Sequence, residues 1–195
     1  MKKYFIILLI LNFIWSSDNI GWEVLTEQPV FIKVLKSNYP HCHAELVIDE
    51  SIDVILKVIQ DVNSYKLFFD SIDISDINDK GEVRLGIDMP FPFSNRDYTV
   101  KFNRLDEENK ISYLYDSIIT DDFPEDKDYI RLIHARGGWI LSKIEDKKTL
   151  VVYKWNGDMR GDFPKWAYTK AWTKQGNEIM LNLKEEVKRR NKIND

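Results

Sequence analysis

The sequence predicts an α+β fold, in which a long antiparallel sheet packs against a long C-terminal helix. Between residues 82 and 155, apolar and polar residues alternate with period two, which is typical of strands with one buried face. Polar turn sequences at 78–81, 106–109 and 145–148 separate these runs, and no helical pattern lies between them. After residue 164 the apolar residues follow helical spacing instead. The two patterns indicate an antiparallel meander followed by one helix.

The elements outside the meander are predicted from shorter patterns. Runs rich in β-branched residues at 29–37 and 44–48 predict a first pair of strands. Acidic residues at 49–50 and apolar residues at helical spacing from Ile52 to Val62 predict a helix of about three turns. Pro164 suits the first turn of the last helix. The apolar stripe of that helix consists of Trp172, Ile179, Met180, Leu183 and Val187, and Gly176 is expected to bend or split it.

Composition limits the function classes. The chain has 195 residues, of which 44% are hydrophobic, and this is enough for one domain with its own core. With 28 Lys and Arg against 32 Asp and Glu there is no basic excess, so we expect no nucleic-acid partner. The single cysteine, Cys42, excludes an intramolecular disulfide. Without a phosphate loop, a dinucleotide fingerprint or a zinc-type cluster, we expect no cofactor and no metal.

The N-terminus has the residue pattern of a targeting signal. Lys2 and Lys3 precede an apolar run over residues 4–15, and small polar residues follow at Ser16 and Ser17. This pattern predicts that residues 1–16 are a secretory signal peptide, with an uncleaved membrane anchor as the alternative. We therefore expect the mature protein to be exported, to the periplasm or the medium, as a single domain over residues 17–195.

One strand contains an unusual charge. Arg96 shares a face with Tyr98, Val100 and Phe102. If this apolar face points into the protein, the guanidinium of Arg96 points inward as well. A buried guanidinium needs a carboxylate, a carbonyl or the polar head of a ligand. In the alternative, Arg96 lies at the sheet margin, where it reaches water or pairs with a nearby aspartate.

Three sequence blocks resemble START (StAR-related lipid transfer) domains. The segment 89–98, MPFPFSNRDY, is similar to the strand that carries the family's RDY motif, most closely in phosphatidylcholine transfer protein. The segment 161–166, GDFPKW, resembles the start of the family's C-terminal helix, and residues 129–132 with 138–139 give a weaker match. The resemblance covers about residues 20–190. It implies the helix-grip (START/Bet v 1-like) fold, a curved antiparallel sheet wrapped around a long C-terminal helix.

The resemblance also implies a function: one lipid or sterol-like molecule is held in a tunnel between the sheet and the helix, for transfer or sequestration. Arg96 then becomes the leading candidate to orient the head of the ligand, while ordinary core packing is the alternative for the aromatic residues. A mostly apolar cavity of several hundred Å³ is expected between the sheet and helix 164–187. The predicted ligand-binding residues are Arg96, Tyr98, Tyr113, Tyr115, Arg131, Trp139, Tyr153, Trp155 and Trp166.

Two other functions stay open at this point. A helix-grip enzyme of the cyclase or dehydratase type would need an acid–base pair, for which only Arg96, His134 and the tyrosines offer themselves, so we expect a non-enzyme. A ligand-sensing interaction module has the same sequence features as a carrier. For the carrier we expect a monomer that makes transient contact with a membrane surface.

Overall fold

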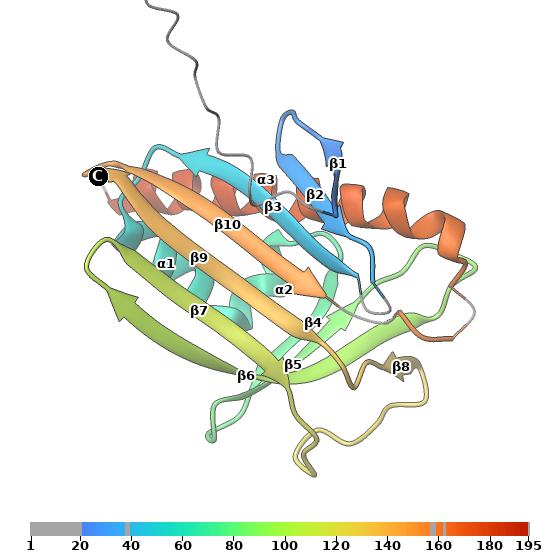
Figure 1. Ribbon diagram of the computed structural model, residues 1–195. Helices are drawn as coiled ribbons and strands as arrows, with labels where there is room; N and C mark the ends of the chain where they lie inside the picture. The colour runs from blue at the N-terminus through green and yellow to red at the C-terminus, as the bar shows by residue number, and fades with distance from the viewer. Residues whose placement is uncertain (1–20, 38–39, 157–158, 162, 195) are drawn as a thin grey trace, which may run out of the picture.

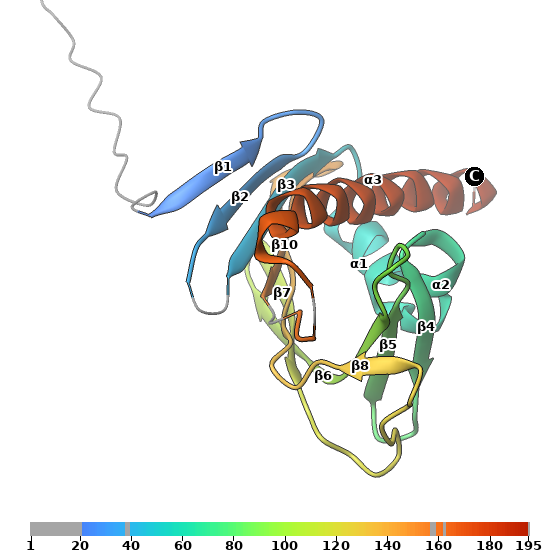
Figure 2. The same cartoon turned by 90° about the vertical axis from the view of Figure 1, so that its right-hand side faces the viewer.

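A curved antiparallel sheet surrounds the long C-terminal helix α3 (Tyr168–Asn194) on its concave side (Figures 1 and 2). The computed structural model describes residues 21–37, 40–156, 159–161 and 163–194. The predicted signal peptide, residues 1–16, lies outside these ranges. No helix in the described ranges combines the length and the apolar character needed to cross a membrane.

The described part of the chain forms ten strands and two longer helices, with short helical turns between them. The helical elements are α1 (Ile52–Gln60), the 3₁₀ turn η1 (Val62–Ser64), α2 (Tyr65–Phe68), the 3₁₀ turn η2 (Lys165–Ala167) and α3. The strands are β1 (Trp22–Thr26), β2 (Phe31–Leu35), β3 (His41–Ile48), β4 (Ile72–Ile77), β5 (Glu82–Ile87), β6 (Asn95–Glu107), β7 (Lys110–Ser117), β8 (Tyr129–Arg131), β9 (Arg136–Glu145) and β10 (Lys148–Asn156).

The strand order is β1-β2-β3-β10-β9-β7-β6-β5-β4. Neighbouring strands pair antiparallel, which confirms the predicted meander, and β10 returns to pair with β3. The short strand β8 is the exception, because it pairs parallel to the start of β6. The sheet therefore joins the N-terminal strands to the last strand, and curls around the helix between them (Figure 2).

Most boundaries follow the sequence pattern, with three differences. The strand predicted over 44–48 begins at His41, because Cys42 and Ala44 both lie in the core and extend the inward face. The last helix begins at Tyr168 rather than at Pro164, since η2 lies between them. Edge strand β1 and the short strand β8 were not predicted, and none of the five residues of β1 is buried.

Gly176 was expected to bend or split the last helix, and this prediction is wrong. Helix α3 runs without interruption from residue 168 to residue 194. A Cβ atom at position 176 would lie 2.8 Å from Ile32 Cδ1 and 3.0 Å from Trp155 Cη2. Glycine at this position therefore permits close packing of the helix on β2 and β10, and this contact explains its place in the middle of the helix.

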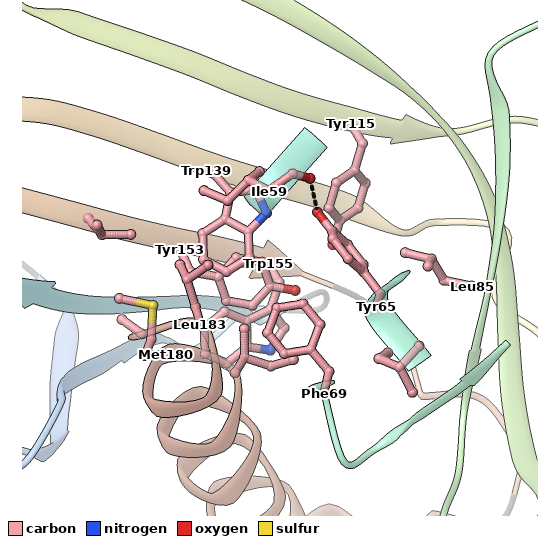
Figure 3. Packing of buried hydrophobic residues seen from close by; sticks show 14 of the residues in the cluster. Ile59, Tyr65, Phe69, Leu85, Tyr115, Trp139, Tyr153, Trp155, Met180 and Leu183 are labelled. Atoms are coloured by element: carbon pink, nitrogen blue, oxygen red, sulfur yellow. Dashed lines mark hydrogen bonds between the residues drawn. The ribbon is translucent and has the colours of Figure 1, made fainter. Parts of the chain in front are cut away.

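The core lies between the concave face of the sheet and the helices (Figure 3). Met180, Leu183 and Val187 of α3 are fully buried against it. Helix α1 adds Ile55 and Ile59. Trp139, Tyr153 and Trp155 lie on the strand side of the same cluster.

A buried ion cluster lies on the opposite face of β6 from Tyr98. Asp97 is fully buried, and both of its carboxylate oxygens accept hydrogen bonds from Arg131, at 2.8 Å each. Arg84 on β5 donates a third, also at 2.8 Å. Arg131 further donates to the carbonyl oxygens of Phe123 and Pro124. The cluster thereby attaches the 118–128 connection and β8 to the sheet.

Replacement of Asp97 by Asn should destabilise the protein strongly. The substitution keeps the side-chain volume but removes the paired carboxylate of the buried Arg131 and leaves Arg84 with Asp126 alone, which costs about 3 kcal/mol in the free energy of unfolding. Urea denaturation measures this. Asp106→Asn, which removes an exposed pair with Arg104, is the control and should stay close to wild type. Equal stabilities of the two variants would contradict a structural role for the cluster.

Candidate functional site

A cavity of about 310 Å³ lies between the sheet and the N-terminal half of α3. Its buried apolar wall includes Leu132, Ala135, Phe163 and Trp172. The mostly apolar cavity that the sequence predicts at this place is confirmed. Its volume lies at the lower end of the range for small-molecule sites, which is about 300–1,000 Å³.

Three buried tyrosines form the polar part of the wall. Tyr98, Tyr115 and Tyr153 come from β6, β7 and β10 and are at most 6% exposed. The side chain of Tyr115 lies close enough to those of Tyr98 and Tyr153 to affect their pKa values. Figure 3 shows Tyr115 and Tyr153 on their strands, within the aromatic cluster. We call this set the tyrosine triad.

Burial raises the pKa of every member of the tyrosine triad. It raises the pKa of Tyr153 to about 12, and it raises the pKa of Tyr98 and Tyr115 as well. The main cause is desolvation, which disfavours the phenolate. The triad is therefore uncharged near neutral pH, and its hydroxyls can both donate and accept hydrogen bonds.

Further polar atoms of the wall have no partner. In the described part of the chain, four buried side-chain polar atoms make no hydrogen bond, and three of them belong to lining residues. These three are Ser71 Oγ, Trp155 Nε1 and Asn156 Oδ1. The fourth is Asn177 Oδ1, which is not in the wall. All three atoms have almost no accessible surface, so their residues line the cavity through other atoms.

Aromatic rings lead from the buried wall toward the mouth of the cavity, which carries charges of both signs. A series of ring contacts runs from the partly exposed Phe93 through Phe163 and Tyr168 to the buried Trp172, with centroid distances of 4.8, 5.4 and 5.0 Å. Trp166 also lines the cavity, and 82% of its surface is exposed. The charged lining residues are exposed or half-buried, and they are Asp88, Lys170, Lys174 and Glu178.

Arg96 lies beside the cavity rather than in its wall. It is 1% exposed, and its Nε and Nη2 atoms donate to the carbonyl oxygens of Met159 at 3.2 Å and Arg160 at 3.3 Å. Its Nη1 donates to the carbonyl oxygen of Ser94. The buried charge thus meets carbonyl oxygens, one of the partners expected from the sequence. Arg96 is absent from the lining, however, because these contacts turn it toward the segment that precedes α3.

The structure divides the other predicted ligand-binding residues into two groups. Tyr98, Tyr115, Tyr153, Trp155 and Trp166 line the cavity, while Tyr113, Arg131 and Trp139 do not. Tyr113 stacks on Phe102 with a centroid distance of 4.5 Å, and Trp139 packs between Phe69 and Tyr153 in the core. Arg131 binds Asp97 on the other face of the sheet.

Several lining residues were missed from the sequence. Phe93 and Phe163 lie within the two family-like segments 89–98 and 161–166, so those motifs could have indicated them. Ser71 carries no such signal, because it comes just before β4 and reaches the site only through the fold. Its backbone N–H donates to Glu178 Oε1 of α3 at 2.6 Å, which ties the edge of the sheet to the helix.

Comparisons with known proteins identify the fold. No protein-family profile and no curated protein matches the sequence. Solved structures do match. A StAR-related lipid transfer protein from Xanthomonas axonopodis superposes with a TM-score of 0.75 at 19% identity, over 86% of this chain and 99% of that one. The chain has the START-domain fold.

Two further solved structures show how widely this fold is shared. Human StAR-related lipid transfer protein 5 gives a TM-score of 0.79 at 15% identity, over 89% of both chains. The Zhui aromatase/cyclase from a Streptomyces species gives 0.52 at 16% identity, over 78% of this chain and 96% of that one. The same helix-grip architecture is therefore present both in lipid transfer proteins and in an enzyme.

Substitution of Arg96 by Met should loosen the segment before α3. It removes three hydrogen bonds to backbone carbonyls and a contact to the Phe163 ring at 5.7 Å. We expect a loss of about 3 kcal/mol in the free energy of unfolding. Faster amide exchange should appear around residues 159–171. Arg136→Met, at an exposed ion pair, is the control. Loss of lipid binding with unchanged local exchange would instead make Arg96 a ligand contact.

The tyrosine triad should make the protein sensitive to alkali. The folded-state pKa of Tyr153 is about 12, above the ordinary value of 10, so the folded state keeps a proton that the unfolded state loses. This contribution to stability is complete below pH 10 and is lost as the pH rises through 12, and it amounts to about 3 kcal/mol. Urea denaturation at increasing pH measures it, and Tyr153→Phe should make the decline shallower. Identical pH profiles of wild type and variant would contradict this origin.

Proposed function

We propose that this protein binds one lipid or other hydrophobic small molecule in its internal cavity, for transfer or sequestration. The observation that carries the proposal is the mostly apolar cavity beside α3, with its few polar groups gathered at the tyrosine triad. Each methylene group buried there contributes about 0.8 kcal/mol to binding, so an acyl chain needs little polar chemistry to be retained. Two proteins of similar structure are StAR-related lipid transfer proteins, which supports the same function.

A carrier has to meet a membrane, and we propose that the mouth of the cavity makes this contact transiently. Phe91 is 97% exposed in the loop between β5 and β6, and Trp166 is exposed at the mouth. Lys170 and Lys174 are exposed in the same lining together with Asp88, so the contact we propose rests on the exposed aromatic rings. The proposal assumes a monomer, with the mouth free of other subunits.

We also propose that the protein works after export. The support is the charged start and the apolar run of residues 1–16, which have the composition of a signal peptide. N-terminal sequencing of protein from the native host tests this: a mature chain should start at or just after residue 17.

An enzyme of the cyclase type is the second candidate, favoured by the fold of the Zhui aromatase/cyclase. Such chemistry needs a base and an acid that reach the same substrate atoms. The raised pKa values of the triad make its hydroxyls weak acids and keep them protonated near neutral pH, so they are poorly suited to either role. The carboxylates of the lining are Asp88, which is exposed, and Glu178, whose Oε1 already accepts a hydrogen bond from the Ser71 backbone. We therefore propose a binding protein without catalytic activity.

Native mass spectrometry with organic extraction tests the proposed function. The purified protein should carry one lipid-like molecule, and extraction should identify it. Ala171→Phe places a ring in the cavity from α3, where there is free volume, and should abolish this adduct without unfolding the protein. Lys188→Phe, on the exposed side of the same helix, is the matched control and should retain it. Release of a chemically altered product would favour the enzyme, and an adduct in both variants would place the ligand elsewhere.

A further inference from the structure

Helix α3 carries a line of lysines along the side that faces away from the core. Their spacing places them on one side of the helix, and the buried residues Trp172, Ile179 and Leu183 lie on the opposite side. The line extends over about 33 Å of the helix, at about 1.5 Å per residue. We call it the lysine stripe, and its members are the half-buried Lys184 and the exposed Lys170, Lys174, Lys188 and Lys192.

The lysine stripe has no acidic partner among the described residues. None of its five ammonium groups lies within 4.0 Å of a carboxylate oxygen there. Glu186 of the same helix is buried and binds Arg189 and Arg190 instead. Outside α3, six lysines do have a carboxylate within this distance, and they are Lys36, Lys66, Lys80, Lys110, Lys143 and Lys148. The stripe therefore presents charge that the described part of the protein does not neutralise.

The stability of the helix does not explain the stripe. Lys170 lies in the first turn, which contains no acidic residue, and a cation at that end opposes the helix dipole. Lys184, Lys188 and Lys192 follow each other at intervals of four, where like charges repel. Of the five, Lys192 alone lies in the last turn, where the dipole favours a cation. The arrangement is unfavourable within the free protein and becomes favourable against an anionic partner.

The charge of the rest of the chain favours a narrow partner over a broad anionic surface. Helix α3 has seven basic and three acidic residues, whereas the whole chain has 28 basic and 32 acidic ones. A membrane of anionic lipids would meet the acidic remainder together with the stripe. The stripe also has no exposed large apolar side chain to insert into lipid, because Leu181 at its centre is half-buried. A single polypeptide segment can contact the stripe alone.

We propose that the lysine stripe binds an acidic segment of a partner protein, which lies along α3. A gap of about 15 Å without lysine separates Lys174 from Lys184, and Leu181 lies in it. A segment that is acidic at both ends and apolar at its centre therefore fits best. Lys170 and Lys174 also line the cavity mouth, so the bound partner lies beside the opening. The proposal goes beyond ligand binding in the cavity and does not depend on it.

Calorimetric titration at low salt with two synthetic peptides tests the proposal. Both have about 22 residues, which as a helix match the length of the stripe. One carries glutamates in both end thirds and a leucine at its centre, and the other carries glutamine in place of every glutamate. The glutamate peptide should bind and the glutamine peptide should not. Binding should weaken steadily as sodium chloride is added, because the contacts are exposed ion pairs.

Two triple variants of equal net charge locate the contact. The stripe variant combines Lys184→Gln, Lys188→Gln and Lys192→Gln, none of which lines the cavity, and should bind the glutamate peptide about tenfold more weakly. The control variant removes three exposed lysines outside α3 and should stay within about twofold of wild type. Its substitutions are Lys57→Gln, Lys101→Gln and Lys127→Gln. Thermal unfolding checks that both variants are folded.

Four outcomes would overturn the proposal. The first is no binding of the glutamate peptide at low salt, and the second is equal weakening by the two triple variants, which would mean that the peptide responds only to net charge. The third is tighter binding to phosphatidylglycerol vesicles than to the peptide, lost in the stripe variant, which would make the occupant a membrane. The fourth is self-association of the wild type alone in sedimentation, also lost in the stripe variant, which would make it a second copy. None of these outcomes affects the proposed function, whose test is the co-purified ligand.

Discussion

The contact between α3 and the concave face of the sheet determines the rest of the structure. The C-terminal part of the helix packs against the sheet through the fully buried side chains of Met180, Leu183 and Val187. Toward its N-terminal end, Ala171, Trp172 and Gln175 face the cavity instead. Gly176 lies between these two regions, where the helix touches Ile32 and Trp155 most closely. One helix therefore supplies both a solid core, which provides stability, and one wall of a binding site. The close contact at Gly176 allows a cavity beside it without separating the helix from the sheet.

The cavity end of the molecule is held together by two arginines rather than by apolar packing alone. Arg96 joins the loop before β6, through Ser94, to the segment before α3, through Met159 and Arg160. On the other face of β6, Asp97 and Arg131 hold the 118–128 connection. The two clusters are linked, because Arg160 Nη1 donates to the carbonyl oxygen of Arg131 at 2.8 Å. Adjacent residues of one strand thus support both sides of the mouth, which follows from the alternation of side chains along a strand.

The sequence predicted the sheet well because period-two alternation reports which face of a strand is buried. The alternation does not show whether a residue on the buried face lies beside the cavity or away from it. Tyr113 and Tyr115 share a face, yet Tyr115 reaches the cavity and Tyr113 stacks on Phe102 outside it. Arg131 shows a second limit. Its partner Asp97 is 34 residues away, and the two meet only because β8 pairs with β6 in a parallel register. Such a register depends on the whole fold, and no local pattern in the chain encodes it.

The distribution of polar groups along the cavity gives the bound ligand a direction. Charged residues lie at the mouth, where water screens them, and the uncharged hydroxyls of Tyr98, Tyr115 and Tyr153 lie in the buried wall. An uncharged polar group of a ligand can pair with these hydroxyls, while the apolar part of the ligand packs against Phe163 and Trp172. This arrangement requires no buried charge, because the buried wall holds none.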